Sequence, residues 1–368
     1  MLTAIEALLS RLIGFATTPD RSNRDLIDWV EEFLTGAGFA VTRIAARGED
    51  KAGLLARFGE GAGGTLLSAH SDVVPVAGQN WSSDPFTLTR RGDRLQGRGA
   101  TDMKGFLACV LALAATLRET PPTTPVMIAL SWDEEIGCRG IPQMIDHVIP
   151  VLGRPALCLV GEPTGMRPAI GHKGKASYHA ICRGEAGHSS LAPRFTNALH
   201  LAADLIAALR AEQVRLIAEG AQDADYDIPC STVHAGKMQG GVALNIVPDR
   251  AEVEFEIRHL AADTPEDILA RIKARLPQGI DIAPTGAYPG LSSDPGDPAL
   301  ARLIALLPDP APIKVSYGTE AGYFAGLGIP TLVCGPGEME RDGHQPDESI
   351  ALDQLALCAR VLDRLVRA

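Results

Sequence analysis

The sequence of 368 residues lacks several patterns that would place it in common protein classes. It has no CxxC pair and an odd number of scattered cysteines, seven in all, which excludes a typical secreted disulfide framework. It has no Lys/Arg cluster and a formal net charge of −11, which argues against nucleic acid or an anionic membrane as partner. No apolar run could span a bilayer, and the N-terminal segment has no signal-peptide pattern. These absences predict a soluble, cytoplasmic protein.

Short, nearly continuous apolar runs indicate strands that are buried on both faces. A strong helix pattern at 105–119 lies between the first two of these runs, and amphipathic helices are expected at 4–15 and 22–37. Strands that alternate with helices in this way imply an α/β fold, with a mostly parallel sheet and helices on both sides. The four expected strands are 65–70, 125–132, 156–162 and 330–335.

The middle of the chain has a different pattern. Two segments alternate apolar and polar residues, as half-exposed antiparallel strands do, and two others are amphipathic helices. We therefore predict an inserted α+β domain at 175–285, between a first domain part at 1–174 and its second part at 286–368. The expected strands of the insertion are 175–184 and 251–260, and its helices are 197–213 and 265–276.

Polar side chains end the buried runs. Because side chains beyond the carboxyl ends of parallel strands converge on one crevice, residues far apart in sequence can meet there. Two histidines and several carboxylates at one site are suitable ligands for divalent metals. The candidates are His70, Asp102, Glu135, Glu162 and His344.

The charges of these residues suit a pair of metal ions. Two divalent cations carry +4, which three carboxylates and one hydroxide balance, and the two histidines add neutral nitrogens. Asp72 is not expected to be a ligand. Residues two apart in an extended chain point to the same side, so Asp72 can accept a hydrogen bond from the second ring nitrogen of His70. Each feature alone has a structural alternative, such as a solvated acidic turn or an acidic helix start.

In combination, these residues make the chain similar to the dinuclear zinc amidohydrolase and exopeptidase family. That family contains acetylornithine deacetylases, succinyl-diaminopimelate desuccinylases, aminoacylases and the carboxypeptidase G group. The matching stretches span essentially the whole chain in the family's order. They are "SAHSDVVP", "GRGATDMKG", "SWDEEIGCRG", "GEPT", "GHKG", "AGHSSLAP", "GGVALNIVPDRAEVEFEIR", "YGTEAGYF" and "GHQPDE".

The resemblance assigns roles to the candidate residues. It implies that His70, Asp102 and Glu162 hold one metal. It implies that Asp102, Glu135 and His344 hold the other, with Asp102 bridging. Both metals would be zinc, with cobalt as the alternative. Glu134 would be the general base. The inserted domain would form a homodimer, in which His188 reaches the neighbouring subunit's site to stabilise an oxyanion.

Within the family, the chain most resembles the acetylornithine deacetylases, through "GEPTGMRPAIGHKGKASY" and "SYGTEAGYF". The implied substrate is N2-acetyl-L-ornithine, cleaved to ornithine and acetate in arginine biosynthesis. Arg258 and Asn245 suit the α-carboxylate of an N-acyl amino acid, although Arg258 could equally form an exposed salt bridge. Glu320 suits the side-chain ammonium, or is a structural carboxylate at a helix start.

Other functions stay open at this point. The same chemistry fits a succinyl-diaminopimelate desuccinylase, a broad aminoacylase or a dipeptidase. A non-catalytic metal-binding or ligand-binding relative would keep the fold, and a plain doubly wound domain would carry the strand-end acids incidentally. The roles of Lys104, Lys173 and His234 are left open.

Overall fold

The computed structural model describes residues 1–367, which form two compact units. The first contains Met1–Gly171, Ser292–Ile313 and the chain from Thr319 onward, and the second contains His172–Leu291 and Lys314–Gly318. The last residue of the expected segment 286–368 lies outside the described residues.

Three segments that the sequence-based division assigns to the first domain group with the second unit: 172–174, 286–291 and Lys314–Gly318. The last of these lies farthest from the predicted boundaries. The Lys314 ammonium donates to Asp223 at 2.6 and 2.8 Å and lies 3.0 Å from Asp225, both in the second unit. These ion pairs fasten the segment there.

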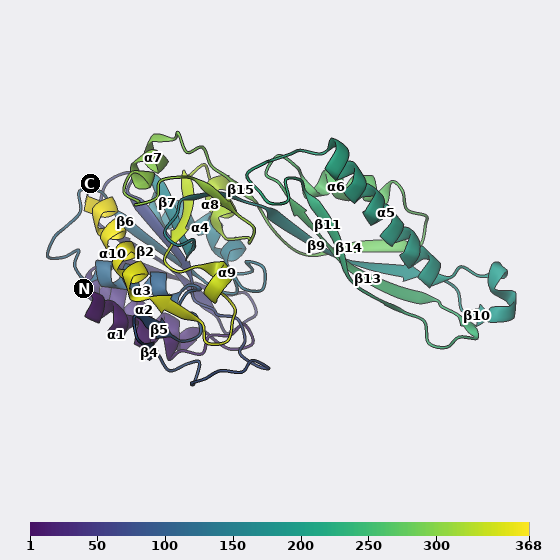
Figure 1. The fold of residues 1–368 in the computed structure, drawn as a ribbon, viewed down its shortest axis with the longest axis horizontal. Helices are drawn as coiled ribbons and strands as arrows, with labels where there is room; N and C mark the ends of the chain where they lie inside the picture. The colour runs from purple at the N-terminus through teal and green to yellow at the C-terminus, as the bar shows by residue number, and fades with distance from the viewer. Residues whose placement is uncertain (368) are drawn as a thin grey trace. The chain divides into compact units, whose positions relative to one another are not determined.

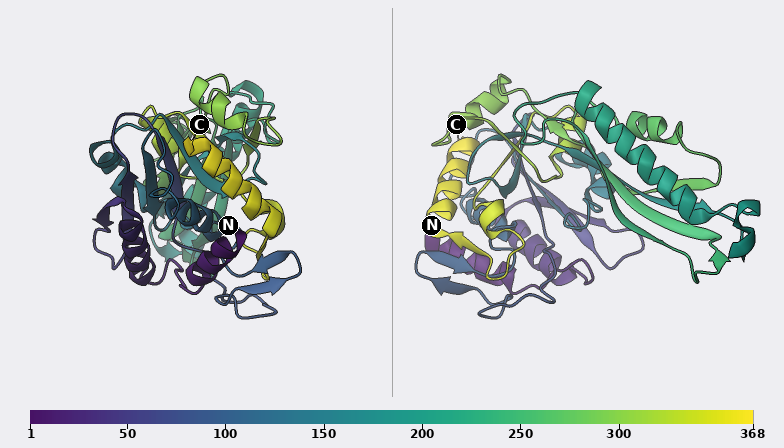
Figure 2. Two further views of the ribbon diagram at one scale, coloured as in Figure 1. Left: turned by 90° about the vertical axis from the view of Figure 1, so that its left-hand side faces the viewer. Right: turned by 45° about the vertical axis from the view of Figure 1, so that its right-hand side comes forward.

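The first unit is built on a nine-stranded sheet with helices on both faces (Figures 1 and 2). Its four central strands are parallel, and the strands on either side of them pair antiparallel. The central strands are fully buried, which explains their continuous apolar sequences. In sheet order, the strands are β1 (Ala40–Ala45), β2 (Ala52–Phe58), β6 (Val126–Ser131), β3 (Thr65–His70), β7 (Leu157–Pro163), β17 (Thr331–Gly335), β8 (Ala169–His172) and β15 (Leu291–Ser292), with β16 (Ile313–Val315) paired to β8.

Two layers of helices cover this sheet. The helices of the first layer share one apolar core, and one of them, α3, is buried along almost its whole length. It contains α1 (Leu2–Ile13), α2 (Arg24–Ala37), α3 (Lys104–Ala114) and α10 (Leu352–Arg367). The other face carries α4 (Ile141–Leu152) and α8 (Ala321–Gly326). Shorter elements are α7 (Pro298–Ile304), α9 (Met339–Asp342), and a three-stranded sheet of β18 (Ser349–Ala351), β5 (Arg94–Gln96) and β4 (Thr89–Arg91).

The second unit is a four-stranded antiparallel sheet with two helices packed on one face. Inward and outward side chains alternate along its central strands, as the sequence predicts. Its strands, in sheet order, are β11 (Thr232–Gly240), β13 (Arg250–His259), β9 (Gly174–Arg183) and β14 (Ile280–Tyr288). Its helices are α5 (Ala198–Glu219) and α6 (Pro265–Lys273), and β10 (Gly187–His188), η1 (Ser189–Arg194) and β12 (Ile246–Val247) form a small extension.

These units confirm the predicted fold class, a largely parallel α/β sheet with flanking helices and an inserted α+β segment. Through residue 367, the structure contains no helix that is both long and apolar enough to traverse a membrane.

Candidate metal centre

The carboxyl ends of the parallel strands bring the predicted ligands together. His70 is the last residue of β3, and Glu162 is the last but one of β7. Glu135 follows β6 in a short turn, beside the same edge of the sheet. Asp102 lies in the segment just before α3, and His344 lies in the loop after α9. The topology therefore converts five distant sequence positions into one cluster.

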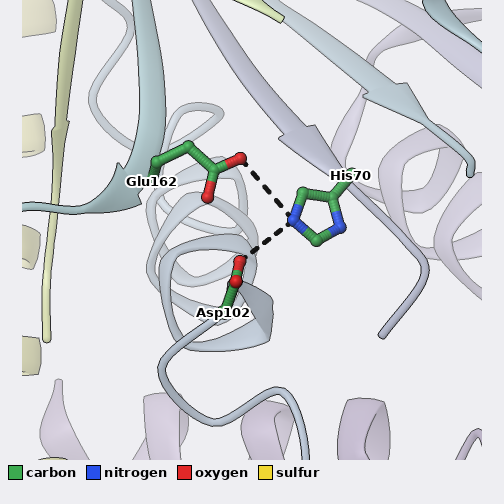
Figure 3. A group of neighbouring side chains, drawn as sticks. All are labelled: His70, Asp102 and Glu162. Atoms are coloured by element: carbon green, nitrogen blue, oxygen red, sulfur yellow. Dashed lines mark hydrogen bonds and ion pairs between the residues drawn. The ribbon is translucent and has the colours of Figure 1, made fainter. Parts of the chain in front are cut away.

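Three buried side chains form the first ligand group. The Nε2 atom of His70 lies 3.1 Å from Asp102 Oδ1 and 3.6 Å from Glu162 Oε1. Figure 3 shows both carboxylates directed at the same ring nitrogen. The ligand atoms of all three residues lie within 4.8 Å of one another, which is close enough for one ion to contact all of them.

The second ligand group shares Asp102 with the first. The Nε2 atom of His344 lies 3.2 Å from Asp102 Oδ2 and 3.0 Å from Glu135 Oε2. Each oxygen of the Asp102 carboxylate thus faces a different histidine. This is the arrangement of a bridging carboxylate between two metal sites. His344 is half exposed, whereas Asp102 and Glu135 are buried.

The electrostatics of the cluster fit a pair of cations. Burial, followed by the nearby charge of Asp102, raises the pKa of Glu162 well above its ordinary value and that of Glu135 to about 7. The carboxylates that accept from His344 raise its pKa to about 10. Within the described chain, Glu135 Oε1 is buried without a hydrogen-bond partner. Three acids and two imidazoles offer a donor set that suits zinc or cobalt.

Glu134 lies beside this cluster, in the turn that also carries Glu135. Its backbone N–H donates to Asp72 Oδ1 at 3.2 Å, and the N–H of Glu135 donates to Asp72 Oδ2 at 3.1 Å. The Cys138 thiol donates to Glu134 Oε1 at 3.3 Å. Burial and the charge of Glu135 raise the pKa of Glu134 well above its ordinary value, although the charge of His70 opposes them. A carboxylate of raised pKa beside ligands is suited to accept a proton.

Asp72 contacts His70 differently from the sequence-based expectation. The Nδ1 atom of His70 lies 3.0 Å from the main-chain oxygen of Asp72, and its distance to the Asp72 carboxylate is longer, 3.5 Å. The ring orientation is therefore fixed mainly by a carbonyl group. The carboxylate instead accepts the two N–H groups of the Glu134–Glu135 turn.

The remaining predicted residues have separate surroundings. In the second unit, His188 is exposed and its Nδ1 accepts from the Ser190 N–H at 3.2 Å, which leaves the proton of the neutral ring on Nε2. Asn245 is exposed, and its main-chain oxygen accepts from the N–H of Ser189. Arg258 donates to Glu256 at 2.9 Å and to the Tyr288 hydroxyl at 2.6 Å.

Glu320 belongs to the first unit, where it is buried at the start of α8. Burial raises its pKa to about 8. Within residues 1–367, its Oε1 atom has no hydrogen-bond partner.

Sequence reasoning missed a buried ion pair that supports the bridging residue. Glu348 accepts from the N–H groups of Gly99, Thr101 and Asp102 at 2.8–3.0 Å. Arg98, fully buried, donates to the same carboxylate at 2.6 Å. The available signal was a charged residue within each of two ligand motifs, "GRGATD" and "GHQPDE".

The family model for Peptidase family M20/M25/M40 matches residues 66–368. The chain belongs to this family. An acetylornithine deacetylase from Myxococcus xanthus is 33% identical over 99% of this chain and 97% of its own length. A second, from Pectobacterium atrosepticum, is 34% identical over 90% of this chain and 87% of its own. The chain is accordingly a metal-dependent amidohydrolase of the M20 family.

Solved structures share the fold. An M20 metallo-carboxypeptidase from Sulfolobus solfataricus superposes with a TM-score of 0.80 at 19% identity, over 98% of this chain and 97% of that one. A dinuclear metal-binding peptidase of the family from Bacillus subtilis has a TM-score of 0.68 at 14% identity, over 99% and 98% of the chains. Two ligand groups that share one carboxylate are consistent with a dinuclear centre in this chain.

Proposed function

We propose that this M20 enzyme removes the acetyl group from N2-acetyl-L-ornithine at a dinuclear site. The observation that carries the chemistry is Asp102 shared between two ligand groups, with Glu134 alongside them. The full-length similarity to acetylornithine deacetylases supports the substrate. The products would be acetate and ornithine, which places the reaction in arginine biosynthesis.

The ligand set proposed here is His70, Asp102 and Glu162 for one ion and Asp102, Glu135 and His344 for the other. Zinc ions, or cobalt ions, bound there would acidify a water molecule and polarise the substrate carbonyl. Glu134 accepts the proton that this water loses when it attacks the amide carbon, and then delivers it to the leaving amine. One water is consumed and one C–N bond breaks, so the reaction balances without another reactant.

Four residues outside the ligand groups, three in the second unit and one in the first, are proposed to bind and stabilise the reacting groups. His188 of a second copy donates its Nε2 proton to the developing oxyanion, which its Nδ1 contact with Ser190 supports. Asn245 and Arg258 bind the α-carboxylate, where Arg258 shares its guanidinium between substrate and Glu256. Glu320 is the counter-charge for the substrate ammonium, and its unpaired Oε1 atom supports that role.

We further propose that the second unit forms the homodimer. Its sheet ends in an edge strand, β11. Met238 on this strand is exposed, and in the segment beyond it Val242 and Leu244 are 85% and 101% exposed and Ile246 is also exposed. Exposed apolar side chains next to a free strand edge are typical of a protein interface.

The Glu134→Gln variant tests the base assignment. Because general acid–base catalysis contributes roughly 100-fold to 10,000-fold, kcat is expected to fall by that factor. Metal content, measured by inductively coupled plasma mass spectrometry, should stay at two ions per chain. The exposed Glu60→Gln variant is the matched control and should keep its kcat. A Glu134→Gln variant with most of its kcat would remove Glu134 from the mechanism.

A substrate panel tests the acyl amino acid. The value of kcat/KM should be greatest for N2-acetyl-L-ornithine, compared with succinyl-diaminopimelate, N-acetylmethionine and a dipeptide. The measurement is made with added zinc and, separately, with added cobalt. A greater kcat/KM for the succinylated substrate would favour a desuccinylase, and similar values for all four would favour a broad aminoacylase or dipeptidase.

A further inference from the structure

A buried ion pair joins Lys51 to Asp133, the residue that immediately precedes the proposed base Glu134. Neither member of the pair is a proposed metal ligand. The Lys51 ammonium donates to both carboxylate oxygens of Asp133, at 2.7 and 2.6 Å, and to the main-chain oxygen of Pro19 at 2.6 Å. The Lys51 and Asp133 side chains are 8% and 3% exposed. Lys51 immediately precedes β2, and Asp133 follows β6, so the pair joins segments 82 residues apart in sequence.

The backbone at Asp133 requires such support. Its φ is +54°, in the left-handed region that a residue with a Cβ atom rarely occupies. Its main-chain oxygen accepts from the Arg139 N–H at 2.9 Å, and the next oxygen, that of Glu134, accepts from Gly137 and Cys138 at 2.8 Å. A left-handed residue at this point reverses the chain, so that Glu134 and Glu135 follow the end of β6 in a tight turn.

Two anchors therefore fix this turn from different sides. Asp72 accepts the N–H groups of Glu134 and Glu135, and Lys51 holds the side chain of the residue before them. Asp72 belongs to the segment that carries His70, whereas Lys51 lies just before β2, a strand without a proposed ligand or base. Among the described residues, the hydrogen-bond and ion-pair partners of Lys51 are Pro19, Glu49 and Asp133, and none of these is a proposed metal ligand.

We infer that Lys51, acting through Asp133, is a positioning residue that holds Glu134 in place for proton transfer. This inference rests on the proposed role of Glu134 as the base. Without the ammonium, the Asp133 carboxylate would be buried and unpaired and would turn toward water, which changes the left-handed backbone before Glu134. Because a displacement of about 1 Å at a catalytic group can cost about 100-fold in rate, the main effect falls on kcat.

The test uses the full-length, metal-loaded enzyme and three variants: Lys51→Met, Asp133→Asn, and the two combined. For each, kcat, KM, metal content and the midpoint of thermal unfolding are measured on N2-acetyl-L-ornithine. We expect Lys51→Met to lower kcat by about 10-fold to 100-fold with KM changed less than 3-fold and two metals retained. The combined variant has no unpaired charge, so it should recover thermal stability while its kcat stays low.

The combined variant also keeps the test decisive if Lys51→Met does not fold. Recovery of both stability and kcat in it would make the pair a purely structural ion pair and overturn the inference. A kcat that falls only in proportion to lost metal would overturn it as well. The matched control is Lys314→Met with Asp223→Asn, a lysine–aspartate pair of the same geometry in the second unit, whose kcat should stay within 2-fold.

The Glu134→Gln variant measured in parallel separates the two claims. If it keeps its kcat, the proposed base is wrong and the inference fails with it. If it loses its kcat while Lys51→Met keeps wild-type kcat, only the positioning role is wrong.

Discussion

Asp72 shows how one buried residue can serve two parts of the candidate site. Its main-chain oxygen orients the His70 ring, and its carboxylate accepts two backbone N–H groups from the turn that carries Glu134 and Glu135. A single residue thereby links a proposed metal ligand to the proposed base. Such outer contacts are often as important to a metal site as the ligands themselves.

The Asp72→Asn variant should weaken this link without removing a ligand. An amide offers one acceptor oxygen and directs an NH₂ donor at one of the two N–H groups, which repels it. We expect kcat and metal affinity each to fall by about 10-fold to 100-fold. Steady-state kinetics and a competition titration with a metal chelator measure the two effects. Unchanged values for both would show that the Asp72 carboxylate does not position the turn.

At the scale of elements, the sequence was informative where a strand or helix is uniformly buried. The strands β3, β6, β7 and β17 match the predicted apolar runs to within one residue at each end. This is because strands buried on both faces have no polar positions to obscure the pattern. The long helix α3 was also found, although it ends at Ala114 and not at residue 119.

Elements with irregular sequences escaped prediction. The strand β14 contains a proline and a glycine at a register shift between Pro284 and Gly286, and β11 has a shift at Gly236, between Ala235 and Lys237. Both residue types weaken a strand pattern, although bulges accommodate them. The helix α4 carries proline in its first turn and again at Pro150, which also disguises it.

The candidate site likewise contains residues that the sequence predicts and residues that it does not. The five proposed ligands could be predicted as a group, because four of them are charged or imidazole residues near the end of an apolar strand or at a helix start, and His344 lies in the loop that follows the last apolar strand. The supporting pairs could not, because nothing in the sequence indicates that Lys51 pairs with Asp133, 82 residues away, or Arg98 with Glu348, 250 residues away. Only the folded chain shows which charges meet.

The loop that carries Asp102 depends on Glu348 for its backbone hydrogen bonds. In Glu348→Gln, an NH₂ group replaces one acceptor oxygen, and at least one N–H group among Gly99, Thr101 and Asp102 loses its partner. We expect the free energy of unfolding to fall by about 1–3 kcal/mol, the cost of a buried unpaired donor. Urea unfolding of the two proteins measures the change. The partly exposed Glu338→Gln should behave as wild type, and equal midpoints for Glu348→Gln would contradict the prediction.

The strand β8 ends in a histidine that makes stability depend on pH. Burial lowers the pKa of His172 to about 4, from 6.5 for an ordinary histidine. Between these values the unfolded chain binds more protons than the folded one, so stability is complete above pH 6.5 and falls as pH decreases toward 4. The loss attributable to His172 is about 3 kcal/mol at most. His172→Gln should show a smaller loss of unfolding free energy between pH 7 and pH 4.5 in urea titrations; an identical loss would exclude the histidine as its cause.

At the scale of the whole molecule, bound metal should stabilise the first unit as well as enable catalysis. Three buried carboxylates converge in the cluster, and burial raises the pKa values of Glu135 and Glu162. Because ions that bind only the folded state shift the equilibrium toward it, exhaustive chelation should abolish activity and lower the thermal midpoint by several degrees. Zinc titration should restore both at two ions per chain. Activity that survives complete metal removal would contradict the proposed chemistry.

The proposed dimer gives the last prediction. Leu244 is fully exposed in the segment that follows the edge strand β11, so a charge at this position costs little in an isolated chain but would be buried at the proposed interface. Leu244→Asp should therefore keep its thermal midpoint and shift sedimentation equilibrium from dimer toward monomer. Since His188 of a second copy is proposed to complete the site, kcat should fall in parallel with the dimer fraction. The exposed Leu2→Asp on α1, in the first unit, is the control. A monomeric Leu244→Asp variant with full kcat would show that each chain carries a complete site.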